Sequence, residues 1–394
     1  MEDRLAQFRP ATATKLLLSL LKIEGPPGKE QEVAQFITDQ LVRSGADPKA
    51  IVTDSAYKKT LLPGNSGNLI FKLKGNMQGP RRLLMAHMDT VPICVGTTPR
   101  QVGDRIVSVN KERGLGGDNR SGCGVILNAA LTILKHDLPH PPLTFLWTVQ
   151  EEVGLQGARC IQRRLLSNPK TGFNWDGQSP SSLIVGATGG YRMDIEITGL
   201  ASHAGNDPEE GISAIAIAAI AIADLQENGW HGLVRKGKKE GTSNVGVIQG
   251  GAATNVVTES VKLRAEARSH DPIFRKRIVR EIELAFKRAV KKVKNSRGQI
   301  GSVTVDGTLD YESFKIKPSE PCVVMAKKVL QSLGEEPIPK VANGGLDANW
   351  MNEHGIPTVT LGCGQREIHT VNETLVVEEY LTACQSALLL ATEG

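Results

Sequence analysis

Two pairs of side chains in this sequence combine residue types that bind divalent metal ions. His87 and Asp89 close an apolar run, and residues i and i+2 of an extended chain point to the same side. The Asp89 carboxylate can then hold one ring nitrogen of His87 while the other nitrogen faces a metal. Glu151 and Glu152 follow a second apolar run, and because adjacent side chains diverge there, one can bind a metal while the other carries a proton. The simpler interpretations are that His87 and Asp89 cap a loop, and that Glu151 and Glu152 are two solvated acids at a strand end.

Three further residues would complete a site for two metal ions. A water shared by two cations needs several carboxylates and imidazoles from separate strand ends, one of them bridging. Asp118 lies in a Gly-Gly-Asp turn before an expected helix, and His369 follows a glycine-rich segment. Asp176 is the only carboxylate between residues 153 and 193. Taken singly, Asp118 also fits a helix-entry turn, and Asp176 fits an Asx turn before Gly177.

The composition is that of a folded, water-soluble protein. The chain has 394 residues, of which 40% are hydrophobic and 23% charged, so it can form two or three domains with buried cores. No apolar run reaches the roughly 20 residues that a membrane-spanning helix needs. The first residues lack the basic-then-apolar order of a signal peptide, so we expect a cytoplasmic protein. The six cysteines form no C-x-x-C pair, which argues against a cysteine zinc site or a disulfide framework.

The elements that must position these residues alternate between helices and strands. Up to residue 189 the order is that of a sheet covered by helices. The expected helices are 11–23, 33–41, 123–134 and 157–166, and the expected strands are 68–73, 83–87, 143–149 and 182–185. After residue 319 the same pattern returns, with helices at 321–333 and 377–390 and a strand at 358–361.

The middle of the chain has a different pattern. Its expected strands are 191–198, 244–249, 256–267 and 300–305, and its expected helices are 212–225 and one that begins after Asp271. This is the β-α-β-β-α-β order of a ferredoxin-like domain. We therefore predict an α/β protein with a three-layer α/β/α catalytic domain, formed by 1–189 and 313–394, and an inserted ferredoxin-like α+β domain at 190–312.

The helix after Asp271 carries lysines and arginines along one face between residues 275 and 297. Such a face can bind nucleic acid or acidic lipid. No aromatic residues are interleaved with the basic ones, and no glycine-rich nucleic-acid motif accompanies them. We therefore expect a solvated face, with neither nucleic acid nor a membrane as a partner.

Five motifs give the sequence a resemblance to a known family. In chain order they are His87-x-Asp89-Thr90-Val91-Pro92, Gly116-Gly117-Asp118, Glu151-Glu152, Ser202-His203-Ala204-Gly205 and Ile368-His369-Thr370. The same motifs occur in this order in the co-catalytic zinc peptidase family of peptidase T, aminoacylase and the glutamate carboxypeptidases. Segments 175–177, 244–251 and 254–257 are most similar to the peptidase T-like branch, the tripeptide aminopeptidases.

The resemblance implies two divalent metal ions per subunit, zinc first, with manganese or cobalt as alternatives. By this resemblance His87 and Asp176 would hold one ion. Glu152 and His369 would hold the other. Asp118 would bridge the two, just before a cis peptide bond.

The resemblance also implies roles around the metals. Asp89 would orient His87, and Glu151 would be the general base. The inserted domain would act as a lid and as the surface of a homodimer. In it His203 would reach the substrate carbonyl, while Asn255 and Arg268 would contact the substrate, Arg268 being suited to clamp a carboxylate.

The implied activity is cleavage of short peptides by a metal-dependent aminopeptidase or tripeptidase. An N-acyl amino acid amidohydrolase or carboxypeptidase on the same scaffold is the alternative, and a noncatalytic binding protein is a more distant one. The sequence departs from the family at Asn119-Arg120-Ser121 and at Trp175-Asp176-Gly177-Gln178, where peptidase T has Val-Asp-Gly-Gly. The second segment lies near where a peptide amino terminus would be read, so the end-group preference stays open.

Overall fold

The computed structural model describes residues 2–393, which divide into two compact units. The first unit consists of Met1–Ala187 and Lys315–Gly394, and the second of Thr188–Phe314. These bounds lie two residues from the predicted ones, and the lid and dimer roles of the second unit stay predictions. No helix in the part of the chain that the structure describes is long and apolar enough to cross a membrane.

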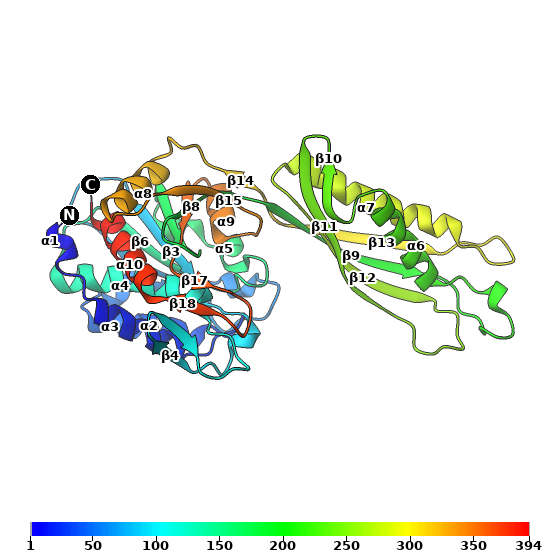
Figure 1. The fold of residues 1–394 in the computed structure, drawn as a ribbon, viewed down its shortest axis with the longest axis horizontal. Helices are drawn as coiled ribbons and strands as arrows, with labels where there is room; N and C mark the ends of the chain where they lie inside the picture. Colours follow the sequence, from blue (N-terminus) through cyan, green and yellow to red (C-terminus); the bar gives the residue numbers. More distant parts are fainter. Residues whose placement is uncertain (1, 394) are drawn as a thin grey trace. The chain divides into compact units, whose positions relative to one another are not determined.

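The first unit is built on a mixed sheet in which β3 lies near the middle (Figure 1). The strands are, in sheet order, β1 (Ile51–Thr53), β2 (Leu69–Leu73), β6 (Leu143–Thr148), β3 (Arg82–His87), β7 (Thr171–Trp175), β16 (Thr358–Leu361), β8 (Ser182–Ala187) and β14 (Phe314–Lys315), with β15 (Ile338–Ala342) paired to β8. β6, β3, β7 and β16 are mutually parallel. Their carboxyl ends therefore lie at one edge of the sheet, where ligand sites of α/β proteins form.

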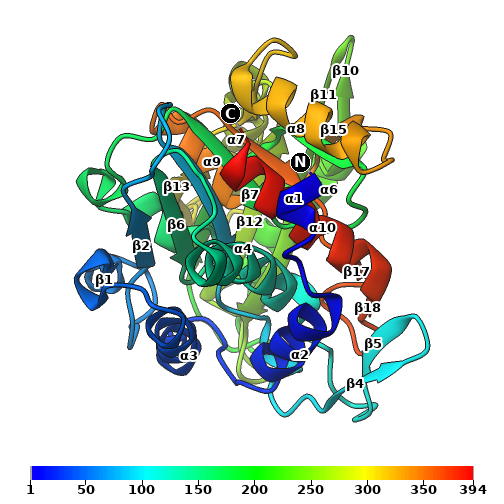
Figure 2. The same cartoon turned by 90° about the vertical axis from the view of Figure 1, so that its left-hand side faces the viewer.

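Helices cover both faces of this sheet. They are α1 (Glu2–Leu5), α2 (Pro10–Leu21), α3 (Gln31–Arg43), α4 (Gly117–His136), α5 (Gln156–Cys160), α8 (Pro321–Ser332), α9 (Asp347–Glu353) and α10 (Val377–Thr392). Alternate side chains of β3 enter different cores: Leu84 and Ala86 pack with residues of α2, α3, α4, α8 and α10, whereas Leu83 and Met85 pack with residues of α5 and α9. Figure 2 shows α4 beside α2 and α3. The predicted three-layer α/β/α architecture is confirmed.

Some local predictions were wrong. The helix expected at 157–166 is broken, because Ile161 has extended backbone angles and only a 3-10 turn follows at Arg163–Leu166. The break lets Ile161 pack into the core under α5 and α9. Strand β7 was missed, because Gly172 and Asn174 interrupt the kind of apolar run that identified β3 and β6, although all its residues are buried. A small sheet was also missed; its strands are β17 (Gln365–Arg366), β18 (Thr374–Val376), β5 (Arg105–Ser108) and β4 (Pro99–Val102).

The second unit is an antiparallel sheet with two helices. Its strands are, in sheet order, β10 (Gly232–Lys236), β11 (Lys239–Gly250), β12 (Ser260–Ser269), β9 (Gly189–Thr198) and β13 (Ser302–Tyr311), and its helices are α6 (Ala214–Glu227) and α7 (Pro272–Lys292). Exposed and buried residues alternate along β9 and β12, and the buried ones share a core with α6 and α7. The predicted α+β unit is confirmed, with β10 as an edge strand that the sequence did not reveal.

Candidate metal centre

The six predicted metal and base residues come from five separate segments of the first unit. β3 ends at His87, Glu151 and Glu152 follow β6, and Asp176 follows β7 directly. Since these three strands are parallel neighbours, their ends bring the four side chains to the same edge of the sheet. Asp118 at the start of α4 and His369 in a loop after β17 complete the group. We call these six residues the cluster.

The backbone around Asp118 is not helical, although it lies at the start of α4. Asp118 has ψ 102°, and the peptide bond from Asp118 to Asn119 is cis. The Asn119 side chain accepts a hydrogen bond from the Gly122 amide at 2.9 Å and donates one to the Trp175 carbonyl at 2.7 Å. Asn119 therefore caps the regular part of α4 and ties it to the end of β7, beside Asp176.

One half of the cluster, which we call the inner half, is formed by His87 and Asp176. His87 Nε2 lies 3.2 Å from Asp118 Oδ1 and 3.6 Å from Asp176 Oδ1. The same nitrogen lies 3.9 Å from Glu151 Oε2. His87 is 1% exposed, so the imidazole of this half is buried.

The outer half is formed by Glu152 and His369. His369 Nε2 lies 3.0 Å from Glu152 Oε2 and 3.2 Å from Asp118 Oδ2. The two Asp118 oxygens thus face different histidines, as a bridging carboxylate requires. The His369 side chain is 47% exposed, so the outer half is open to solvent.

Asp89 forms contacts with residues of both halves without being a proposed metal ligand. The His87 Nδ1 atom lies 3.1 Å from the Asp89 carbonyl oxygen and 3.4 Å from its carboxylate. The same carboxylate accepts the backbone N–H groups of Glu151 at 3.0 Å and Glu152 at 3.1 Å. One buried side chain therefore fixes the direction of the imidazole ring and the position of both glutamates.

The pKa shifts of the cluster residues indicate an excess of buried negative charge. Burial raises the pKa of Glu151 well above its usual value and also raises that of Asp176, against the influence of His87. Burial alone would lower the pKa of His87, but Glu151, Asp176 and Asp118 together raise it well above normal. The metal-free inner half is therefore a site that strongly attracts positive charge.

The outer half behaves in the same way. Burial raises the pKa of Glu152 to about 7 against the hydrogen bond from His369. Hydrogen bonds to Asp118 and Glu152 raise the pKa of His369 to about 10. For Asp118 the same kind of bond, from His369 and His87, outweighs burial and lowers the pKa.

This donor set fits two divalent cations. Two overlapping groups of possible donor atoms each lie within 4.8 Å of one another: His87 with Asp118 and Glu152, and His87 with Glu151 and Asp176. His369 belongs to neither group but lies 3.0 Å from Glu152. Imidazoles and carboxylates suit zinc, and carboxylate-rich sites also accept manganese and cobalt. The cluster opens into a cavity of about 490 Å³, which is large enough for a small peptide and is lined also by Gln178, Lys340 and Leu346.

The predicted residues of the second unit lie together only in part. His203 pairs through its backbone with Val256, and the Ala204 amide donates to the Asn255 carbonyl at 2.9 Å, so His203 and Asn255 are neighbours. Arg268, on β12, already forms two hydrogen bonds with the Glu266 carboxylate, at 2.9 and 3.0 Å. A substrate carboxylate would have to compete with Glu266 for this guanidinium.

Three buried acids contact the segments that carry the cluster and were missed in the sequence. Glu30 accepts the Gln150 amide at 3.0 Å, and Glu373 accepts the Asp118 amide at 2.9 Å. Asp347 accepts the hydroxyl hydrogen bond of Thr148, and burial raises its pKa to about 7. No local pattern marks these acids, because each lies far along the chain from the loop it supports.

Comparisons with known proteins agree with this geometry. The chain is 30% identical over 378 residues to the uncharacterized protein YqjE of Bacillus subtilis, which covers 96% of both chains. A tripeptidase from Staphylococcus aureus has a similar structure, with TM-score 0.86, 30% identity and 98% of both chains covered. Aminopeptidase PepT from Bacillus cereus gives TM-score 0.83 at 30% identity, with 98% of this chain and 99% of that one covered.

The family model extends over most of the chain. It matches residues 83–393, which begin within β3 just before His87 and include the whole cluster and the second unit. A buried set of imidazoles and carboxylates at the ends of parallel strands is the chemistry that a metal-dependent hydrolase requires. Together, the match and the cluster show that the chain belongs to peptidase family M20/M25/M40 and is a metallo-hydrolase of that family.

Proposed function

We propose that this protein is a two-metal-dependent peptidase that cleaves short peptides, with the aminopeptidase activity of a tripeptidase. The observation that carries the proposal is the placement of Asp118, whose two carboxylate oxygens each lie 3.2 Å from a different histidine. Glu151 lies beside the two proposed metal positions, with its Oε2 atom 3.9 Å from His87 Nε2, and is not one of the proposed ligands. The site thus offers two metal positions and one additional carboxylate.

Glu151 is the proposed general base. Two bound cations would polarise the scissile carbonyl and make the attacking water more acidic. Glu151 takes the proton of that water and delivers it to the nitrogen of the leaving amine. Its buried position and raised pKa suit a group that must hold the proton between these steps.

His203 is the proposed donor to the oxygen of the scissile carbonyl. Its Nδ1 atom accepts the amides of Gly205 and Asn206 at 3.1 and 3.0 Å. An Nδ1 that accepts hydrogen bonds leaves the proton of a neutral ring on Nε2, which can then donate to an oxyanion. Asn255 and Arg268 are proposed substrate contacts of the same unit.

The tripeptidase assignment is supported by the tripeptidase and PepT structures, each 30% identical over nearly the whole chain. The test compares alanine tripeptide, its N-acetylated form and alanine dipeptide as substrates of the protein, with zinc, manganese or cobalt added after chelation. We expect the free-amine tripeptide to be cleaved at least tenfold faster than the acetylated one. The reverse preference would identify an amidohydrolase or carboxypeptidase, and no cleavage by the metal-loaded protein would refute a peptidase.

We also propose a homodimer formed through the second unit, and a cytoplasmic location. Sedimentation of the purified protein gives the subunit number directly. A monomer at micromolar concentration would refute the dimer and leave the proposed chemistry of the first unit untouched.

A further inference from the structure

We infer that Glu373 is a positioning residue of the metal centre, whose carboxylate holds Asp118 in the orientation that lets it face both metal positions. The inference rests on the proposed two-metal site. Glu373 follows His369 by four residues but lies 255 residues from Asp118 along the chain. Its contacts join the two segments that meet at the outer half of the cluster.

Each Glu373 oxygen accepts one backbone amide at the start of α4, and Oε2 also lies 3.6 Å from Cys94 Sγ. Oε2 accepts the Gly116 N–H at 2.6 Å, and Oε1 accepts the Asp118 N–H at 2.9 Å. Glu373 is 2% exposed, so water does not compete for these bonds. Hydrogen bonds to an ionised acceptor are about twice as strong as neutral ones. The carboxylate therefore fixes the backbone on both sides of Gly117.

Glu373 also belongs to the loop that carries His369. Its own N–H donates to the Thr370 carbonyl at 3.3 Å. His369 has φ 65°, a left-handed conformation that a non-glycine residue adopts only when its surroundings hold it there. One residue thus links the His369 loop to the Asp118 turn, and these two segments supply atoms that lie 3.2 Å apart.

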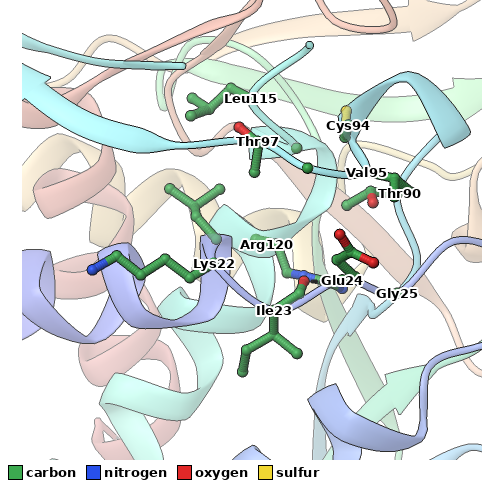
Figure 3. Close-up of a pocket in the computed structure, with 13 residues that line it drawn as sticks. Lys22, Ile23, Glu24, Gly25, Thr90, Cys94, Val95, Thr97, Leu115 and Arg120 are labelled. Atoms are coloured by element: carbon green, nitrogen blue, oxygen red, sulfur yellow. Dashed lines mark hydrogen bonds between the residues drawn. The ribbon is translucent and has the colours of Figure 1, made fainter. Parts of the chain in front are cut away.

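The backbone that leads into Asp118 has a small unfilled space on one side. A cavity of about 30 Å³ borders it, lined among others by Cys94, Gly116 and Arg120 (Figure 3). Gly116 has φ 80°, so glycine suits this position and no side chain is available there to anchor the turn. The Gly117 carbonyl accepts hydrogen bonds from the Ser121 hydroxyl at 2.7 Å and from the Gln365 amide at 3.2 Å, while Glu373 holds the N–H groups of Gly116 and Asp118 on either side of it.

Glu30 provides a matched comparison. It is a fully buried carboxylate that also accepts two amides near the cluster, but a single oxygen, Oε1, accepts both, from Gly28 at 2.8 Å and from Gln150 at 3.0 Å. Glutamine at position 30 keeps that oxygen. Glutamine at position 373 can accept only one amide and turns its NH₂ group toward the other N–H. Burial raises the pKa of Glu30 to about 7, so only well above that pH do both substitutions remove one buried negative charge. Only the second substitution breaks the amide geometry.

The test measures zinc affinity, which does not depend on turnover. Wild type, Glu373→Gln and Glu30→Gln are stripped of metal and titrated with zinc against a chromophoric chelator. Loss of a group that supports a metal ligand typically weakens metal affinity by about 10- to 100-fold. We expect a loss of this size for Glu373→Gln and a change within about threefold for Glu30→Gln, in which the amide contacts survive.

Circular dichroism and thermal unfolding of the metal-free variants establish that they are folded. If Glu373→Gln does not fold, Glu373→Asp serves instead, because its shorter side chain keeps the charge but cannot reach both amides; a weaker zinc affinity is again expected. Wild-type zinc affinity in the folded Glu373 variant would overturn the inference. Equal losses in the Glu373 and Glu30 variants would also overturn it, because charge alone would then explain the effect. Wild type that binds fewer than two zinc ions would contradict the proposed function instead.

Discussion

The inner and outer halves of the cluster use the same residue types and differ in what holds them. His87 ends a central strand, is 1% exposed and is oriented by Asp89, whereas the His369 side chain is 47% exposed and belongs to a loop with left-handed residues. The strand end is held because β6 pairs with β3 as far as His87 and β7 pairs with it as far as Met85. The loop depends on individual hydrogen bonds, those of Glu373 among them. We therefore expect a tightly held inner metal and a more exchangeable outer metal.

Asp118→Ala should have the largest effect, because Asp118 is the one residue that both halves share. The variant should lose both metals, and its kcat/KM should fall by at least about 10⁴-fold. The reason is that none of the remaining carboxylates and imidazoles can replace the bridging ligand. Elemental analysis of the purified variant checks this. Retention of one full equivalent of metal would mean that the inner half binds without the bridge.

Glu151→Gln should separate chemistry from metal binding. A general base typically contributes about 10²- to 10⁴-fold to the rate, so kcat should fall within that range. Metal content should stay at the wild-type level, because Asp89 still accepts the amide of residue 151. Near-normal turnover would remove Glu151 from its role, and loss of metal would make it a ligand of the inner half.

His87→Ala and His369→Ala compare the halves directly. We expect His87→Ala to weaken zinc binding more and also to destabilise the fold, because it leaves a cavity at a fully buried position. His369→Ala should lose only the outer metal and unfold near the wild-type temperature. Zinc titration together with thermal unfolding measures both effects. Equal losses from the two variants would show that exposure does not distinguish the halves.

The effect of pH should be smaller and graded. Metal must displace protons from His369, whose pKa is raised to about 10, and below about pH 7 also from Glu152. Zinc affinity should therefore fall as the pH falls from 9 to 6, by up to about tenfold per pH unit for each proton released. Calorimetry in buffers of different ionisation enthalpy counts the protons. Binding that is independent of pH would contradict the protonated state of the metal-free outer half.

The sequence determined the parts of this protein that depend on short-range periodicity. One apolar run placed His87 and Asp89 at a strand end, and the apolar run before Glu151 identified a second strand end. Parallel strands bring such ends to one edge, so their convergence followed from the fold class. The mixed three-layer architecture could be predicted for the same reason, whereas β7 could not, because Gly172 and Asn174 interrupt the kind of apolar run that identified β3 and β6.

Only the tertiary structure decided which distant acids support the site. Glu30 lies 120 residues from Gln150, one of the two residues whose amides it accepts, and Glu373 lies 255 residues from Asp118, so neither has a local pattern that reveals its contact with the site. The chain folds so that buried amides at irregular turns meet buried carboxylates, because an unpaired N–H group in the interior is costly. Sequence spacing could indicate the metal ligands, but the hydrogen bonds that hold them in place arise only when remote segments pack together.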